Sequence, residues 1–207
     1  MEQLADERSG VLVSDETGFL KKGTKSAGGA RPYSGTAGRR ENQQIGVLLL
    51  SASDRGAAFI DRALYLPDEW MGAAARREEA HIPAQVGFAT KGALARELVA
   101  RAFAAAVPAR WIVGDTVDSG DELRRWLEGQ GRNYVLAVPS THGIWTRARQ
   151  LTVDQLVLQL SADTWVRLSA GEGSHGPRCA GTTGPAGACP IPPRQQGKPT
   201  GYWRAAA

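Results

Sequence analysis

The chain has 207 residues, 42% of them hydrophobic and 22% charged, which is typical of one folded domain with a possible appendage. Its formal net charge of +4 permits a nucleic-acid partner but does not demand one. No apolar run approaches the roughly 18 residues of a membrane span. Because its start, MEQLADERSG, is polar and unlike a secretory signal, we expect a cytoplasmic protein with no membrane partner.

Three strands are predicted in the first third of the chain. Residues 11–13 form a short, apolar, β-branched run that leads directly into Asp15. Residues 45–50 are almost continuously apolar, which is typical of a central strand buried on both faces. After a turn, residues 59–66 complete a hairpin, and a charged pair inside this third strand indicates partial exposure.

A long polar connection, residues 16–43, separates the first two strands and is rich in Gly, Ser and Thr. Several of its cations are candidate contacts to DNA phosphates. These are Lys21, Lys22, Lys25, Arg39 and Arg40. The alternative interpretation is an ordinary solvated loop. A second connection, residues 67–83, is charged and alanine-rich, and we expect a loop with a short helix there.

Helices and strands alternate in the middle of the chain. Thr90 is placed to cap a helix whose apolar residues recur at three- and four-residue spacing. Residues 111–113 form a short strand that ends at Gly-Asp, with Asp115 as the acid. A capping-box spacing begins the next helix, and Gly129 suits its C-terminal cap. Residues 134–138 form a further strand.

The last part of the chain changes character. A weak amphipathic helix is predicted for residues 153–160 and a strand for 165–168. From residue 178 onward there is no Leu, Val, Phe or Met, and such a segment buries too little apolar surface to offset its ordering entropy. We therefore expect a catalytic-type domain over residues 1–178 and a disordered, non-native tail over residues 179–207.

Three strands followed by helix, strand, helix and strand is the element order of the ribonuclease H-like fold, an α/β mixed sheet with flanking helices, here incomplete. In that fold the first and fourth strands are parallel neighbours, so Asp15 and Asp115 would lie side by side. Two such carboxylates suit Mg²⁺, which takes oxygen ligands and bridges to phosphates. The alternative is that both aspartates serve turns or helix caps.

Five stretches together resemble a known family. The first, DETGFLKKGTKSAGGARPYSGTAGRRENQQIGVLL, is similar to the amino-terminal catalytic segment of DDE transposases from bacterial insertion sequences. The others follow in the family's order: DRALYLPDEW, VGFATKGALA, WIVGDTVDSGDELRRWLEGQGRNYVLAVP and WVRLSAGEGSHGPR. The resemblance covers about residues 11–178, and it is much more specific than the aspartate spacing alone.

The resemblance implies that Asp15 and Asp115 are the first two catalytic acids and metal ligands of such an enzyme. The activity implied is Mg²⁺- or Mn²⁺-dependent cleavage of double-stranded DNA at transposon ends, followed by joining to target DNA. The third acid of the family, a glutamate on a later helix, would fall after the end of this chain. After Arg178 the family pattern stops, and we interpret this as a frameshift or a decayed gene end.

A chain without the third acid is expected to be weak or inactive as an enzyme. Two further functions remain open. One is a non-catalytic DNA-binding remnant that assembles with itself or with a full-length transposase and modulates it. The other is an unrelated α/β enzyme that handles a small phosphate compound. The cationic connection and the absence of a P-loop motif count against this last alternative.

Overall fold

The structure is a computed structural model that describes residues 10–23, 25–30, 33–34, 39–115, 121–146, 149–161, 168–173 and 176–180. The chain divides into two compact units, Met1–Val138 and Pro139–Ala207. The predicted acids and cations all belong to the first unit. Each unit is described by itself.

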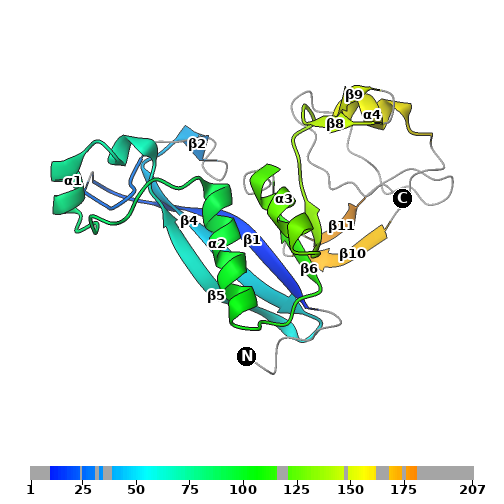
Figure 1. The fold of residues 1–207 in the computed structure, drawn as a ribbon, viewed down its shortest axis with the longest axis horizontal. Coiled ribbons are helices and arrows are strands. Elements are labelled where there is room, and N and C mark those ends of the chain that lie inside the picture. Colours follow the sequence, from blue (N-terminus) through cyan, green and yellow to red (C-terminus); the bar gives the residue numbers. More distant parts are fainter. Residues whose placement is uncertain are drawn as a thin grey trace. The chain divides into compact units, whose positions relative to one another are not determined.

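The first unit is built on one five-stranded sheet with the order β5-β4-β1-β6-β7 (Figure 1). Its strands are β1 Val11–Leu20, β4 Gln43–Ser53, β5 Gly56–Tyr65, β6 Trp111–Gly114 and β7 Asn133–Leu136. β4 is antiparallel to both β1 and β5, whereas β6 is parallel to both β1 and β7. This mixed sheet with flanking helices confirms the predicted ribonuclease H-like fold class.

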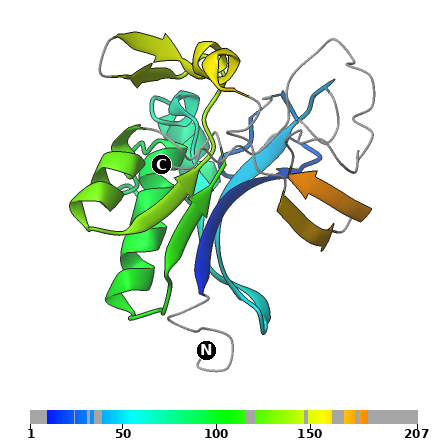
Figure 2. The same cartoon turned by 90° about the vertical axis from the view of Figure 1, so that its right-hand side faces the viewer.

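Two helices cover one face of this sheet, α2 Lys91–Ala104 and α3 Asp121–Gly129 (Figure 2). α2 begins where it was predicted, because Oγ1 of Thr90 accepts a hydrogen bond from the amide of Ala93 at 3.1 Å. Residues alternate between the two faces of each strand, and the buried set faces the helices. The fully buried apolar residues of this core are Leu12, Val47, Leu49, Ala95, Leu98, Val99, Ile112, Leu123 and Leu127.

The opposite face of the sheet carries the alternate residues of the same strands. The register places Asp15 of β1 opposite Leu48 of β4, and Leu48 opposite Arg62 of β5. β5 contains one extra residue, Ile60, because Phe59 pairs with Leu50 while Asp61 pairs with Leu49. This bulge changes the alternation along β5, so that Phe59 and Arg62 share one face although they are three positions apart.

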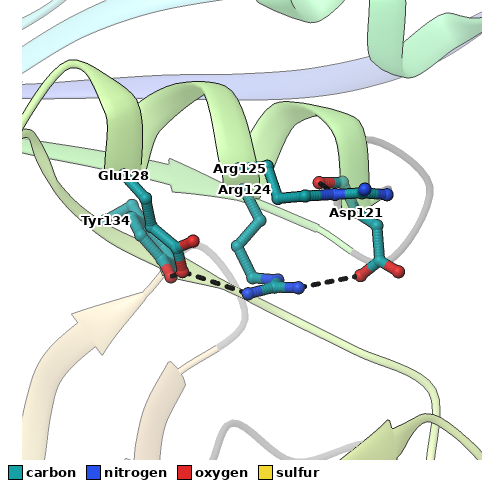
Figure 3. Close-up of polar contacts among 5 residues, drawn as sticks. All are labelled: Asp121, Arg124, Arg125, Glu128 and Tyr134. Atoms are coloured by element: carbon teal, nitrogen blue, oxygen red, sulfur yellow. Dashed lines mark hydrogen bonds and ion pairs between the residues drawn. The ribbon is translucent and has the colours of Figure 1, made fainter.

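A polar network joins α3 to β7 (Figure 3). The hydroxyl of Tyr134 donates to Oε1 of Glu128 at 2.6 Å, and this hydrogen bond lowers the pKa of Glu128. Arg124 bridges Glu128 and Asp121 at 3.0 and 3.3 Å. Arg125 Nε donates to the carbonyl of Asp121 at 3.1 Å. The network therefore links the helix to strand β7, the direct neighbour of β6.

Between β5 and α2 lie a 3₁₀ helix, η1 Asp68–Trp70, and a short helix, α1 Ala74–Glu79. This agrees with the predicted loop and short helix. Trp70 is fully buried there, and its indole Nε1 donates to the carbonyl of Gly29 at 3.0 Å. A two-stranded ribbon, β2 Tyr33–Ser34 and β3 Arg39–Arg40, lies in the connection between β1 and β4.

Two local predictions are wrong. The first strand does not end before Ser14: β1 continues to Leu20, because residues 15–20 pair with residues 43–48 of β4. The glycine that allows α3 to end is Gly131 and not Gly129, because Gly131 has the positive φ of 61° that suits a left-handed C-terminal turn.

The second unit contains two hairpins and one helix. β8 Gly143–Trp145 pairs with β9 Gln150–Thr152, and β10 Leu168–Gly173 pairs with β11 Gly176–Ala180. The helix α4 Val153–Gln159 begins with a capping box formed by Thr152 and Gln155, close to its prediction.

Other predictions for this unit reach beyond the described residues. Residues 165–167 of the predicted strand are outside them, and so are residues 181–207 of the predicted tail; its first two residues, Cys179 and Ala180, belong to β11. In the parts of the chain that the structure describes, no helix has the length and apolar character needed to cross a membrane.

Candidate active site

The two predicted acids meet at the centre of the sheet. Ser14 of β1 and Gly114 of β6 are the last register partners of these parallel strands, and Asp15 and Asp115 follow them directly. Ser14 and Gly114 are buried on the helix side, so each following side chain lies on the opposite face. Asp15 is exposed and Asp115 half-buried.

The surroundings of Asp15 disfavour its charge when no cation is near. Burial of one side of the carboxyl raises the pKa of Asp15, and the nearby charge of Asp115 raises it further. The amide of Glu16 opposes this by donating to Oδ1 of Asp15 at 2.8 Å. Asp15 Oδ1 thus has a backbone partner, while the charge of Asp115 disfavours ionisation of the same carboxyl.

This donor set fits a divalent cation. Both groups are carboxylates, the hard oxygen ligands that Mg²⁺ and Mn²⁺ take, and their mutual repulsion is relieved by a cation between them. Among the described residues, no group of three or more His, Cys, Asp or Glu side chains comes together to hold a metal ion. Asp15 and Asp115 are thus the two side chains here that could hold such an ion, with water or phosphate oxygens as its further ligands.

Glu16 is not part of this donor set, although it directly follows Asp15. Its side chain lies on the helix side of β1 and forms an ion pair with Lys91, the first residue of α2. Both side chains are mostly buried, with 24% and 21% of their surface exposed. Lys91 also lies 5.5 Å from the ring centroid of Tyr65 on β5. The pair ties the acid-bearing part of β1 to the start of α2.

The predicted phosphate-contacting lysines differ in whether their charge is already paired with an acid. Lys21 and Lys22 directly follow β1, and neither forms an ion pair among the residues that the structure describes. Lys25 forms an ion pair with Glu79 of α1, which raises the pKa of Lys25. Arg39 and Arg40 make up β3. The structure thus separates Lys25, whose charge is already paired, from the two lysines nearest to the end of β1.

The segment that carries these lysines is held by specific contacts. The side chain of Asn42 donates to the carbonyls of Lys21 and Gly23, and Gln44 Nε2 donates to the carbonyl of Ala27 at 2.6 Å. The Arg76 guanidinium stacks on Trp70 at 3.9 Å and donates to the carbonyl of Gly29 at 2.9 Å. The predicted polar connection therefore has a defined conformation in this part.

The sequence prediction missed two features near the acids. The Glu16–Lys91 pair joins the DETGF and ATKGALA stretches, and the only signal for it was that both belong to the resemblance. Arg62 lies on the same face as Asp15, in the same row across β1, β4 and β5. Strand alternation alone does not find Arg62, because the bulge at Ile60 changes the alternation.

Comparison with known protein families gives one match. The family model described as DDE superfamily endonuclease matches residues 1–156, about three quarters of the chain. The matched region includes the whole sheet with both acids and the cationic connection. No curated protein and no solved structure matches the chain.

Proposed function

Because the chain belongs to the DDE superfamily of endonucleases, we propose that it derives from a transposase of a bacterial insertion sequence that cuts DNA at the element's ends and joins them to target DNA. The observation that carries the proposal is that Asp15 and Asp115 lie together where the parallel pairing of β1 with β6 ends. Nucleases of this superfamily generally use divalent metal ions, and we propose Mg²⁺ or Mn²⁺ here.

Each acid has a defined part in this proposal. Asp15 is held by its own strand and by the amide of Glu16, and together with Asp115 it would hold one cation. The cation, when bound, neutralises the charge that develops on a phosphodiester as a water or a 3′-hydroxyl displaces the leaving oxygen. Lys21 and Lys22 bind neighbouring phosphates and hold the DNA in register.

A nicking assay tests the proposal. The full chain is incubated with supercoiled plasmid and Mn²⁺, next to the Asp15→Asn and Asp115→Asn variants. Asp68→Asn is the matched control, because Asp68 is an exposed acid in η1, away from the pair. Any nicking by the unaltered chain is expected to be weak, to persist in the control and to be absent from the other two variants. Equal nicking by all four proteins would mean that the acid pair does not act.

A second function follows if the unaltered chain does not nick DNA: a non-catalytic remnant that binds DNA and modulates a full-length transposase by mixed assembly. The loop around Lys21 and Lys22 favours it, because its contacts to Asn42 and Gln44 do not involve the acids. Metal-independent binding of double-stranded DNA by the Asp15→Asn variant, as tight as that of the unaltered chain, is the expected result. The inactivity predicted from the missing third acid, and a cytoplasmic location, stay predictions.

A further inference from the structure

The face of the sheet that carries Asp15 is mostly apolar, with very few charges. In the described strands β1, β4, β5, β6 and β7, the charged residues on this face are Asp15 and Arg62. They lie in one row, with Leu48 between them, so two strand spacings, about 10 Å, separate their backbones. A single cation therefore lies beside the acid pair on an otherwise apolar surface.

The charge of Arg62 is available to a ligand. Asp61, its neighbour in sequence, points to the helix side of β5, where Arg101 Nε donates to Asp61 Oδ2 at 2.8 Å. This hydrogen bond lowers the pKa of Asp61, and the charge of Arg62 lowers it further by a smaller amount, so Arg101 is the main partner of this carboxylate. Among the described residues Arg62 forms no ion pair of its own, and its side chain is exposed. Guanidinium groups placed in this way bind phosphates strongly.

Two exposed aromatic rings flank Arg62. Phe59 of β5 is 68% exposed and Phe19 of β1 is 46% exposed. The ring of Phe19 lies over Gly46, where an added Cβ would come within 3.1 Å of Phe19 Cε2, so glycine is what allows the ring to lie against the sheet. Both rings line an open groove of about 450 Å³, whose other lining residues are Thr17, Leu48, Ile60, Asp61 and Arg62. Thr17 follows Asp15 on the same face of β1, which makes the groove continuous with the acids.

We propose that this groove binds single-stranded DNA next to the cut, with Arg62 on a phosphate and Phe59 and Phe19 stacked on unpaired bases. This inference rests on the proposed function and adds a substrate form, a locally unpaired strand, to the same site. Aromatic rings that alternate with a cation are the elements with which proteins bind single strands without reading their sequence. A paired base offers no free face to these rings, so the groove discriminates against intact duplex.

Fluorescence anisotropy with the full chain tests this proposal. The probes are a fluorescein-labelled single-stranded oligonucleotide and the corresponding duplex, in EDTA and over a range of salt concentrations. The test variants are Arg62→Gln and Phe59→Ala. Their matched controls are Arg55→Gln, an exposed cation at the tip of the same hairpin, and Phe88→Ala, an aromatic residue 48% exposed outside the groove. Thermal melting of each variant reports on folding.

The two test variants should weaken single-strand binding in different ways. Phe59→Ala is expected to weaken single-strand binding by about fivefold or more without changing its salt dependence. Arg62→Gln is expected to weaken binding and also to reduce the slope of log affinity against log salt by about 0.7, the contribution of one phosphate contact in single strands. Arg62→Lys keeps the charge and should keep the slope. If Arg62 had only a structural role, Arg62→Gln and Arg62→Lys would not differ in their effect on the salt slope.

Several outcomes would overturn the inference. These are an unchanged salt slope for Arg62→Gln, an unchanged affinity for Phe59→Ala, losses in the control variants equal to those in the test variants, and binding of the duplex as tightly as the single strand. The proposed function is judged separately, because Asp15→Asn and Asp115→Asn abolish nicking but should leave strand binding in EDTA intact. Loss of nicking in those variants together with unaltered binding by the groove variants would reject the groove alone.

Discussion

Asp15 and Asp115 lie at equivalent positions of two parallel neighbouring strands, one residue beyond the register pair Ser14 and Gly114. Burial and the charge of Asp115 both raise the pKa of Asp15, so its ionised form opposes folding at pH values above the pKa of the unfolded chain. The acid pair therefore reduces the stability of the metal-free protein, a cost that a bound cation would offset.

The first prediction is a change in thermal stability. Asp15→Asn keeps the oxygen that accepts from the Glu16 amide and removes the charge, so the metal-free variant should melt at a higher temperature than the unaltered chain at pH 7. Mn²⁺ should raise the melting temperature of the unaltered chain and leave that of the variant unchanged. Differential scanning fluorimetry measures both. A variant that responds to Mn²⁺ as the unaltered chain does would place the ion elsewhere.

A second prediction concerns Asp61 and Arg101, which join β5 to α2. The hydrogen bond from Arg101 lowers the pKa of Asp61, so its contribution is present above the unfolded pKa of about 3.9 and is lost as the pH falls through the lower folded value. Asp61→Asn should lower the free energy of unfolding at pH 7 by about 0.3–1 kcal/mol. Urea unfolding should show that the difference in free energy of unfolding between the variant and the unaltered chain is smaller in acid than at pH 7.

Glu97→Gln is the control for this pair, because Glu97 contacts the same guanidinium from one helical turn away, at 3.0 Å and without joining two elements. Its effect at pH 7 should be smaller. A deficit of Asp61→Asn that is as large in acid as at pH 7 would show that the carboxylate charge is not its cause.

A third prediction tests the loop that presents the lysines. Gly28 has a φ of +70°, and a Cβ there would lie 2.7 Å from the carbonyl oxygen of Tyr65. Gly28→Ala should therefore destabilise the protein by more than about 1 kcal/mol. Gly23→Ala is the matched control, because Gly23 has a similar φ of +86° but nothing within 4 Å. Equal losses in the two variants, measured by urea unfolding, would mean that the contact with Tyr65 has no effect.

A fourth prediction separates the three lysines by their contribution to DNA binding. Lys21→Ala and Lys22→Ala should each weaken binding of double-stranded DNA and reduce the salt slope by about 0.9. Lys25→Ala should change both less, because Glu79 already pairs with that ammonium group. Anisotropy titrations over a range of salt concentrations measure these effects. A larger effect of Lys25→Ala than of the other two would reverse the assignment.

The sequence predicted the sheet well where a strand has local signals. The apolar run in β4 and the Gly-Asp that follows β6 were enough to place the acids. The second half of β1 was missed because Asp15, Glu16 and Gly18 have little strand propensity, and their extended form comes from pairing with a segment some 30 residues away. Pairing with a distant strand determines the extended conformation of such a segment, and local propensity does not predict that conformation.

The candidate site was predictable only in part, for a related reason. Its acids each follow an apolar strand, so their position was visible in the sequence. Arg62 was not, because the bulge at Ile60 puts Phe59 and Arg62 on one face while simple alternation puts them on opposite faces. Trp70 was likewise assigned to a loop, although contacts to Gly29 from a distant part of the chain bury it completely.

The unequal lengths of β1 and β6 have a consequence for how the protein behaves in concentrated solution. β1 has ten residues and β6 has four, so beyond Ser14 the described chain has no strand beside β1 on that side. Within the described residues, β1 has a strand on both sides as far as Ser14 and only β4 from Asp15 onward, so that part is an edge of the described sheet. Such edges recruit extended segments of other chains and template self-association. The part of β1 from Asp15 onward, where a substrate would reach the acids, is thus also the place where we expect aggregation to begin.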